Sequence, residues 1–364
     1  MKYQDKARGI LVGLAVGDAL GAPVEFLPDP SDVYIKEMGD KIEHFHKNCR
    51  APEGVWTDDT EMALCIADSL LANKGYDSYD IMRRFQAWSE NGYRTYDGKP
   101  AVDVGMQTAR AIEDFIAQPV VFRDDPKTES AGNGAIMRLA PIIIANTFPN
   151  KKYPTLKDAY EKGKLVVDPE DDGDSEYIDK KDIEPTLKMA ELSCRETHDS
   201  IAACTVTEMF ATCVYLALHG LNKHNIATYC SRWVMGEEYD GFWMNNNDML
   251  VGRAFKSEED WLCNLGGYIV DAFTIALWGL IHFDNFKDGM MAVIRLGGDT
   301  DTNGAIYGQL AGAYYGYEKI PEEWRKNVFQ ADELVEIADK LLEMPECSVI
   351  RTRFEDDENF EEPK

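Results

Sequence analysis

Residues 296–316 read LGGDTDTNGAIYGQLAGAYYG, and this stretch constrains the packing of the whole chain. Its glycines Gly304, Gly308, Gly312 and Gly316 recur every four residues, so they lie along one side of a helix. Glycine costs about 1 kcal/mol relative to alanine inside a helix, and close approach of a second helix is the simplest compensation. We therefore expect this helix to pack tightly against another.

The N-terminal segment repeats the same spacing with Gly9, Gly13, Gly17 and Gly21, within GILVGLAVGDALGAPVE. We predict that the two glycine-lined helices pack in one core. The spacing also resembles the small-residue motif of membrane helices. However, polar residues interrupt both segments, and neither holds the roughly 18 apolar residues that a membrane span needs. The sequence therefore predicts no membrane partner.

Asp299, Asp301 and Thr302 form a dense group of oxygen donors at the start of the second helix. Carboxylates this close repel each other, so a neutralising partner is expected, and oxygen ligands suit Mg²⁺, Mn²⁺ or Ca²⁺ better than zinc. A helix cap is the alternative interpretation. Thr302 could cap the helix, and the helix dipole favours acidic residues near its N-terminus.

A second acidic cluster, WTDDTE, spans residues 56–61 and leads into a segment with helical spacing of its apolar residues. Asp58 and Glu61 match a capping box, which is the structural alternative here. A single cap does not require the run TDDT, however. A dinuclear site needs more oxygen ligands than one cluster supplies, so we interpret the two clusters as two halves of one metal site.

Other polar residues are candidates on weaker grounds. Glu25 follows the end of the N-terminal glycine-lined helix, where most glutamates are simply solvated. The run GNG at residues 132–134 precedes an expected helix, whose free backbone N–H groups could bind a phosphate. Asp103 fits a helix N-cap, and His198 lies between two expected helices, where a structural role is the commoner one.

Composition excludes several classes of protein. The 364 residues are 45% apolar, and 38 basic against 65 acidic residues give a net charge of −27. This charge disfavours binding to nucleic acid or anionic membranes. The eight cysteines form no CxxC pair, and the N-terminal residues MKYQDKARG lack an apolar signal core, so we expect reduced thiols and a cytoplasmic protein.

Strand patterns are few, so the predicted class is all-α. We expect one compact domain over residues 1–364, with surface insertions at 149–185 and 239–261 and an acidic tail at 355–364.

Five motifs occur in a fixed order, and together they resemble the ADP-ribosylglycohydrolase family, including its dinitrogenase-reductase-activating branch. They are GxxxGxAxGDAxGxxxE, WTDDT, GNGxxMRxxP, a Thr-His pair and GGDTDTxxAxxGxxxGAxYG. The resemblance covers about residues 5–340 apart from the two insertions. It implies an orthogonal bundle of helices, a dinuclear Mg²⁺ or Mn²⁺ site and hydrolysis of an ADP-ribosyl bond.

The resemblance also assigns residues by position. The metal ligands would be Thr57, Asp58, Asp59, Asp299, Asp301 and Thr302. Glu25 and Asp103 would be catalytic. The substrate-binding residues would be Gly105, Gly132, Asn133, Gly134, Met137 and His198. The substrate would be an ADP-ribosylated protein or a small ADP-ribosyl compound, and a monomer is favoured.

The linkage and the activity leave alternatives open. The Asp-Val-Gly run at Asp103 resembles the branch that cleaves an ADP-ribosyl-arginine bond, but Met106 replaces the asparagine that tends to follow there. A serine-linked substrate is the alternative. A non-catalytic relative that binds ADP-ribose is a second rival, and a phosphoester hydrolase with two metals is a third.

Overall fold

The computed structural model describes residues 3–27, 52–102, 104–122, 131–147, 165–166, 176–177, 180–227, 254, 256, 265–345 and 347–352. The α-helices in this part of the chain are α1 (Tyr3–Gly21), α3 (Asp58–Asn73), α4 (Ser78–Asn91), α5 (Met106–Ala117), α6 (Ala140–Ala145), α8 (Lys180–Arg195), α9 (Ile201–Leu218), α11 (Ile269–His282), α12 (Phe286–Arg295), α13 (Thr300–Tyr315), α14 (Glu322–Asn327) and α15 (Ala331–Leu342). Single 3₁₀ turns are η1 (Ala22–Val24), η2 (Asn133–Ala135) and η6 (Tyr317–Lys319).

Strands are minor elements of the fold. β1 (Tyr76–Asp77) pairs in parallel with β4 (Val349–Arg351), and β2 (Leu165–Val166) pairs in parallel with β3 (Glu176–Tyr177). Helices therefore supply nearly all of the regular structure in the described residues, and the predicted all-α class is confirmed.

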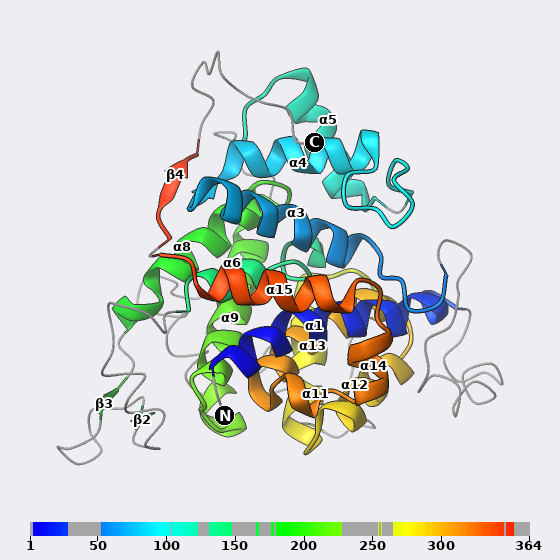
Figure 1. Ribbon diagram of the computed structural model, residues 1–364, viewed down its shortest axis with the longest axis vertical. Coiled ribbons are helices and arrows are strands. Elements are labelled where there is room, and N and C mark those ends of the chain that lie inside the picture. The colour runs from blue at the N-terminus through cyan, green and yellow to red at the C-terminus, as the bar shows by residue number, and fades with distance from the viewer. Residues whose placement is uncertain are drawn as a thin grey trace.

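Helices α1 and α13 pack against each other, antiparallel along several turns, near the centre of the molecule (Figure 1). Their glycines face one another in register: a Cβ atom added at Gly13 would overlap the carbonyl oxygen of Gly308, and one at Gly17 would overlap that of Gly304. The predicted seam of two glycine-lined helices is thus confirmed. At this seam the backbones of the two helices are in direct contact, and any side chain larger than that of glycine would prevent so close an approach.

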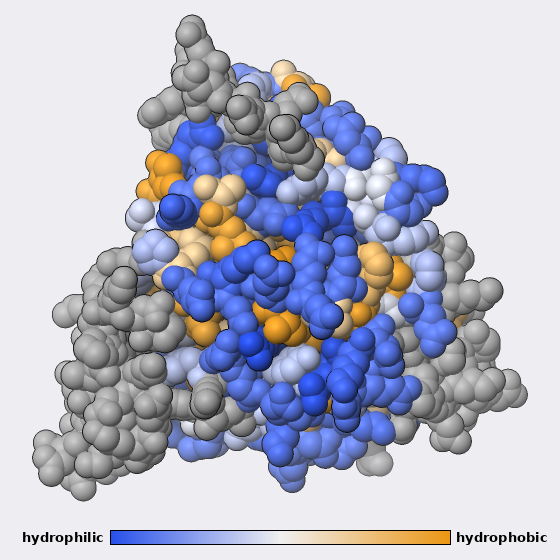
Figure 2. Space-filling view, viewed as in Figure 1, coloured by the Kyte–Doolittle hydropathy of each residue, from blue (hydrophilic) through white to orange (hydrophobic). Residues whose placement is uncertain are grey.

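The other helices surround this central pair. In Figure 1, α3 and α4 lie on one side of it, α11, α12 and α14 lie on the opposite side, and α8 and α9 flank it. The face shown in Figure 2 is mainly hydrophilic with separate apolar patches, as the acidic composition leads one to expect.

Among the described residues, two helices are long and apolar enough, by length and composition alone, to cross a membrane: residues 3–24 and α9. The expectation that the N-terminal segment falls short of this length was therefore wrong. In the structure, however, 89% and 78% of their most apolar windows are buried inside the protein. Burial of this extent is typical of the core helices of a globular fold.

Two helix starts lie near boundaries that the sequence suggested. Helix α8 begins at Lys180, inside the range 149–185 assigned to an insertion, and it contains Pro185. Helix α5 begins after Gly105, and Asp103, the expected N-cap, lies outside the described residues. Most of the insertion at 239–261 and the tail 355–364 also lie outside them.

Candidate metal centre

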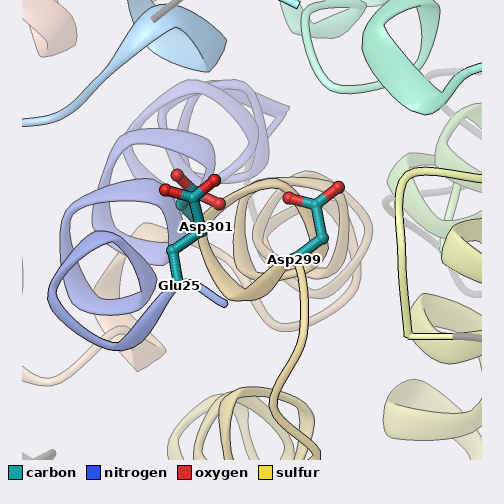
Figure 3. Close-up of side chains that lie close together, drawn as sticks. All are labelled: Glu25, Asp299 and Asp301. Carbon is teal, nitrogen blue, oxygen red and sulfur yellow. The ribbon is translucent and has the colours of Figure 1, made fainter. Parts of the chain in front are cut away.

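Three carboxylates meet at the junction of α1 and α13. The ligand oxygens of Glu25, Asp299 and Asp301 all lie within 4.8 Å of one another. In Figure 3 the carboxylates of Glu25 and Asp301 overlap in the view, and that of Asp299 lies to one side of them. The turn η1 carries the chain from the end of α1 to Glu25, and the backbone N–H of Phe26 donates to the carbonyl of Gly298 at 2.8 Å. This bond holds Glu25 beside the start of α13.

Asp18 of α1 brings the first acidic cluster to the same place. Its Oδ1 accepts hydrogen bonds from the backbone N–H and the hydroxyl of Thr57, both at 2.8 Å. Its Oδ2 accepts from the N–H and the hydroxyl of Thr60, at 3.1 and 2.6 Å. A carboxylate from another helix therefore satisfies orphan donors at the N-terminus of α3.

The residues expected to cap the two helices, Asp58 and Thr302, are not their N-caps. Thr57 is the N-cap of α3 but makes no side-chain cap bond, because its hydroxyl donates to Asp18. Asp299, and not Thr302, is the N-cap of α13, again without a side-chain cap bond. The backbone N–H of Thr302 instead donates to Oδ1 of Asp301 at 2.9 Å. The acidic residues of both clusters do lie in the first turns of α3 and α13, where the helix dipole favours them, but their side chains make no cap bond.

Carboxylates of the two clusters raise one another's pKa values. Burial raises the pKa of Asp58 well above its ordinary value, and the charges of Asp18, Glu61, Asp299 and Glu25 raise it further. The pKa values of two other carboxylates are raised in the same way. For Asp59 the causes are burial, then Asp18, Asp58, Asp301 and Asp299. For Asp301 they are burial, then Asp299, Glu25, Asp18 and Asp58.

The carboxylate of Asp59 provides the test of whether a cation fits this place. Asp59 is fully buried, and neither of its two oxygens has a hydrogen-bond partner among the described residues. A buried, unpaired carboxylate is costly unless a cation or a donor meets it. The surrounding donors are carboxylate and hydroxyl oxygens, which suit a hard divalent cation. The residues present therefore fit a metal centre.

Sequence reasoning overlooked Asp18 as part of the site. The residue is fully buried, and burial raises the pKa of its carboxyl group to about 6 although the four hydrogen bonds lower it. The pattern that could have revealed it is an aspartate in an otherwise apolar, glycine-lined helix, since an acidic residue is seldom buried without a specific partner.

The loop at residues 131–136 lies against this carboxylate cluster. Asn133 donates from its Nδ2 to Oδ2 of Asp299 at 2.8 Å, and its backbone N–H donates to Gly267 at 2.9 Å. Gly132 forms an antiparallel bridge with Tyr268. A helix follows this loop as predicted, although it starts as the 3₁₀ turn η2 at residues 133–135 and α6 begins at Ala140. The N–H of Asn133 is therefore already bonded.

His198 packs directly onto this loop. A Cβ at Gly132 would lie 3.1 Å from its Nε2, and a Cβ at Gly134 would lie 2.8 Å from its Cε1. The space beside both glycines is thus filled by the imidazole ring. Burial, and then the charge of Arg138, lower the pKa of His198 to about 3, so the ring is neutral.

The remaining candidates lie in different surroundings. Met137 is buried, and its carbonyl accepts from Nε2 of Gln309 on α13 at 2.8 Å. Gly105 is exposed at the start of α5, with open space where a Cβ would point. The structure therefore gathers Glu25 and both acidic clusters, with Asn133 in contact, and it seats His198 under the loop. Asp103 lies outside the described residues.

Comparison with known proteins agrees with this architecture. The model of the ADP-ribosylglycohydrolase family matches residues 1–166 and 177–348. An ADP-ribosylarginine hydrolase, Tri1, of Serratia proteamaculans is 27% identical over 93% of this chain and 80% of its own length. The ADP-ribosyl-[dinitrogen reductase] glycohydrolase of Rhodospirillum rubrum is 28% identical, over 88% of this chain and 89% of its own length.

Two further relatives extend the similarity. ADP-ribosylhydrolase ARH3 of Gallus gallus is 25% identical over 93% of this chain and 92% of its own. A solved structure, described as an ADP-ribosylglycohydrolase-related protein complex, superposes with a TM-score of 0.68 and 31% identity, and covers 94% of this chain and 98% of the other.

The helical fold and these relatives define the chain as an enzyme that hydrolyses glycosyl bonds. It belongs to the ADP-ribosylglycohydrolase family.

Proposed function

We propose that this enzyme releases ADP-ribose from ADP-ribosylated protein, with two divalent ions, Mg²⁺ or Mn²⁺, in the carboxylate cluster. The observation that supports this proposal is the cluster itself. Ligand oxygens of Glu25, Asp299 and Asp301 lie within 4.8 Å of one another, and the oxygens of the buried Asp59 have no hydrogen-bond partner among the described residues. Carboxylates arranged this way repel each other, and this repulsion is removed when cations bind between them.

The metal ligands on this proposal come from both clusters, namely Thr57, Asp58, Asp59, Asp299, Asp301 and Thr302. When bound, divalent ions supply Lewis-acid positions for ribose hydroxyls and for a water molecule. Cleavage of the bond at the anomeric carbon builds positive charge on the ribose, which nearby carboxylates stabilise. Glu25 would orient the attacking water and accept its proton, and its place beside Asp299 and Asp301 supports this role.

The loop at Gly132, Asn133 and Gly134 would hold the nucleotide part of the substrate. The contact between Asn133 and Asp299 supports this role, because it joins the loop to the carboxylate cluster and so fixes one relative to the other. A loop tied to the reacting centre reduces the ordering that substrate binding would otherwise require.

We further propose that the enzyme prefers ADP-ribosyl-arginine to ADP-ribosyl-serine. The support comes from the relatives, since the proteins from Serratia proteamaculans and Pseudomonas putida are ADP-ribosylarginine hydrolases, at 27% and 26% identity. Asp103 would pair with the guanidinium of such a substrate, because a carboxylate matches its planar fork of donors.

The test is hydrolysis of two matched peptides, one modified at arginine and one at serine, with released ADP-ribose measured by chromatography. We expect faster release from arginine, loss of activity in chelator and recovery when Mg²⁺ or Mn²⁺ is restored. Asp59→Asn should be inactive, and Glu336→Gln, which removes a charge from an exposed ion pair on α15, should be as active as the unmodified enzyme. Faster release from serine would reverse the assigned linkage, and activity in full chelator would exclude the metal centre.

A further inference from the structure

A buried arginine next to the nucleotide loop has no role in the function proposed above. Arg138 is fully buried. Its Nη2 donates to the hydroxyl of Thr197 at 2.6 Å and to the carbonyl of Ser193 at 3.1 Å, and its guanidinium carbon lies 4.7 Å from the ring centroid of Phe85. Burying a cation is expensive, so an arginine held in this way is expected to orient its partners in a defined geometry.

Thr197 connects Arg138 to His198 through its hydroxyl group. The threonine hydroxyl oxygen lies 2.7 Å from Nδ1 of His198. A guanidinium only donates, so the bond from Arg138 occupies a lone pair of the hydroxyl and leaves its hydrogen for the imidazole. When that hydrogen is directed at the ring, Nδ1 is the acceptor and the proton of the neutral ring is on Nε2, whereas the opposite tautomer would need the second lone pair of the hydroxyl. The backbone of His198 is also held, since Sγ of Cys194 donates to its carbonyl at 3.2 Å.

The protonated edge of the ring is the one that meets the loop. A Cβ added at either Gly132 or Gly134 would lie 3.1 Å from Nε2. The ring therefore occupies the space that a side chain at either position would need. Asn133 lies between these glycines and donates to Asp299. A rotation of the ring would therefore move the loop that is attached to the carboxylate cluster.

We propose that Arg138 is a positioning residue: through the hydroxyl of Thr197 it holds His198 as the Nε2–H tautomer, and the fixed ring sets the conformation in which the Gly132–Gly134 loop binds nucleotide. The nucleotide part of this inference rests on the proposed function, whereas the tautomer does not. Burial and Arg138 also lower the pKa of His198 to about 3, which keeps the ring neutral at the pH of the measurement.

Thr197→Val is the test, because it removes the hydroxyl and preserves the shape of the side chain, while a change at Arg138 endangers folding. Thr197→Ser restores the hydroxyl. The matched control is Thr212→Val on α9, a buried threonine whose hydroxyl donates to the carbonyl of Glu208 at 2.8 Å. All four proteins are compared with Mg²⁺, which is diamagnetic, in calorimetric titrations with ADP-ribose and in ¹⁵N spectra of the histidine side chains, where His198→Gln assigns the signals.

We expect the Nε2–H tautomer in the unmodified enzyme, in Thr197→Ser and in Thr212→Val, and a mixture of tautomers in Thr197→Val. The dissociation constant for ADP-ribose should rise up to about tenfold in Thr197→Val alone, with Mg²⁺ affinity unchanged. An Nδ1–H tautomer in the unmodified enzyme would overturn the proposal, as would equal affinities of Thr197→Val and Thr212→Val. An unmodified enzyme that binds no ADP-ribose would contradict the proposed function, and the tautomer would then decide whether the relay from Arg138 exists.

Discussion

Asn133 donates a hydrogen bond from its side-chain amide to Oδ2 of Asp299, 166 residues further along the chain, at 2.8 Å. This bond joins the loop that we expect to bind nucleotide to the carboxylates that we expect to bind metal. A neutral amide donor suits this position, because it orients one carboxylate oxygen and adds no negative charge to a cluster that already repels itself.

Asn133→Ala should lower kcat/KM about tenfold, because it removes one hydrogen bond to Asp299. Asn133→Asp should lower it further, since it places a carboxylate against a carboxylate. Steady-state kinetics on ADP-ribosylated peptide measures both. The control is Asn146→Ala, which loses a buried amide bonded to the carbonyl of Ile142 in α6. Equal activity of the Ala and Asp variants would show that the charge at this position does not matter.

Asp18→Asn should weaken Mn²⁺ binding about 10–100-fold, although Asp18 is not among the proposed ligands. An amide offers one accepting oxygen where the carboxylate offers two, so its NH₂ group would face donors of Thr57 or Thr60. Calorimetric titration with Mn²⁺ measures the change. Asp80→Asn, which loses the pairing of Asp80 with Arg84, should leave Mn²⁺ affinity unaltered. If Asp18→Asn binds Mn²⁺ normally, the N-terminus of α3 does not depend on this residue for its position.

Glu25→Gln should reduce kcat about 10²–10⁴-fold while metal occupancy changes less, because a glutamine keeps an oxygen near Asp299 and Asp301 but cannot accept a proton. Turnover and Mn²⁺ stoichiometry are measured on the same preparation, with Glu336→Gln as the control for removing a glutamate charge. A variant that loses Mn²⁺ in proportion to its activity would make Glu25 a metal ligand. A variant with the native rate would remove it from the mechanism.

Gly13→Ala should destabilise the protein by about 1–3 kcal/mol, because the new methyl group overlaps the carbonyl of Gly308 and forces α1 and α13 apart. Gly105→Ala is the matched control, since nothing lies within 4 Å of a Cβ at that position. Urea unfolding gives both free energies. A Gly13→Ala protein as stable as the unmodified one would mean that the seam tolerates separation of the two helices.

The buried Lys6 predicts a pH-dependent stability. Burial lowers its pKa to about 7, from 10.5, and its Nζ donates to the carbonyl of Ala217. Between pH 7 and 10.5 the unfolded chain therefore binds more protons at this residue than the folded one. The contribution of Lys6 to the free energy of unfolding thus rises with pH, by up to about 1.4 kcal/mol per unit.

Below about pH 7 Lys6 is charged in both the folded and the unfolded chain, so the full cost of burying its charge lowers the free energy of unfolding. Urea unfolding at pH 7, 8 and 9 of the unmodified protein and of Lys6→Met, which cannot titrate, measures this contribution as the difference between the two. The difference should change in favour of the unmodified protein as the pH rises. A constant difference would show that Lys6 keeps an ordinary pKa in the folded state.

The helical class and the central packing could both be predicted from the spacing of residues along the chain. Spacing of four is a local property of a helix, so the glycine rows of α1 and α13 predicted a close seam before any contact was known. The composition and density of the two Thr/Asp clusters likewise predicted that each would lie at a helix start, which α3 and α13 confirm.

The contacts between these helices and loops could not be predicted in the same way, because they depend on how the chain packs. Asp18 was indistinguishable from an interruption of an apolar helix until α3 was placed against it, because its partners lie 39 and 42 residues away. The sequence of the Gly132–Gly134 loop suggested a helix start. In the structure the backbone N–H of Asn133 donates to Gly267 and its side-chain amide donates to Asp299, both far along the chain. Local spacing reports which residues share a face of one helix, whereas the partner of a buried charge is set by which helices cross, and that depends on packing over the whole chain.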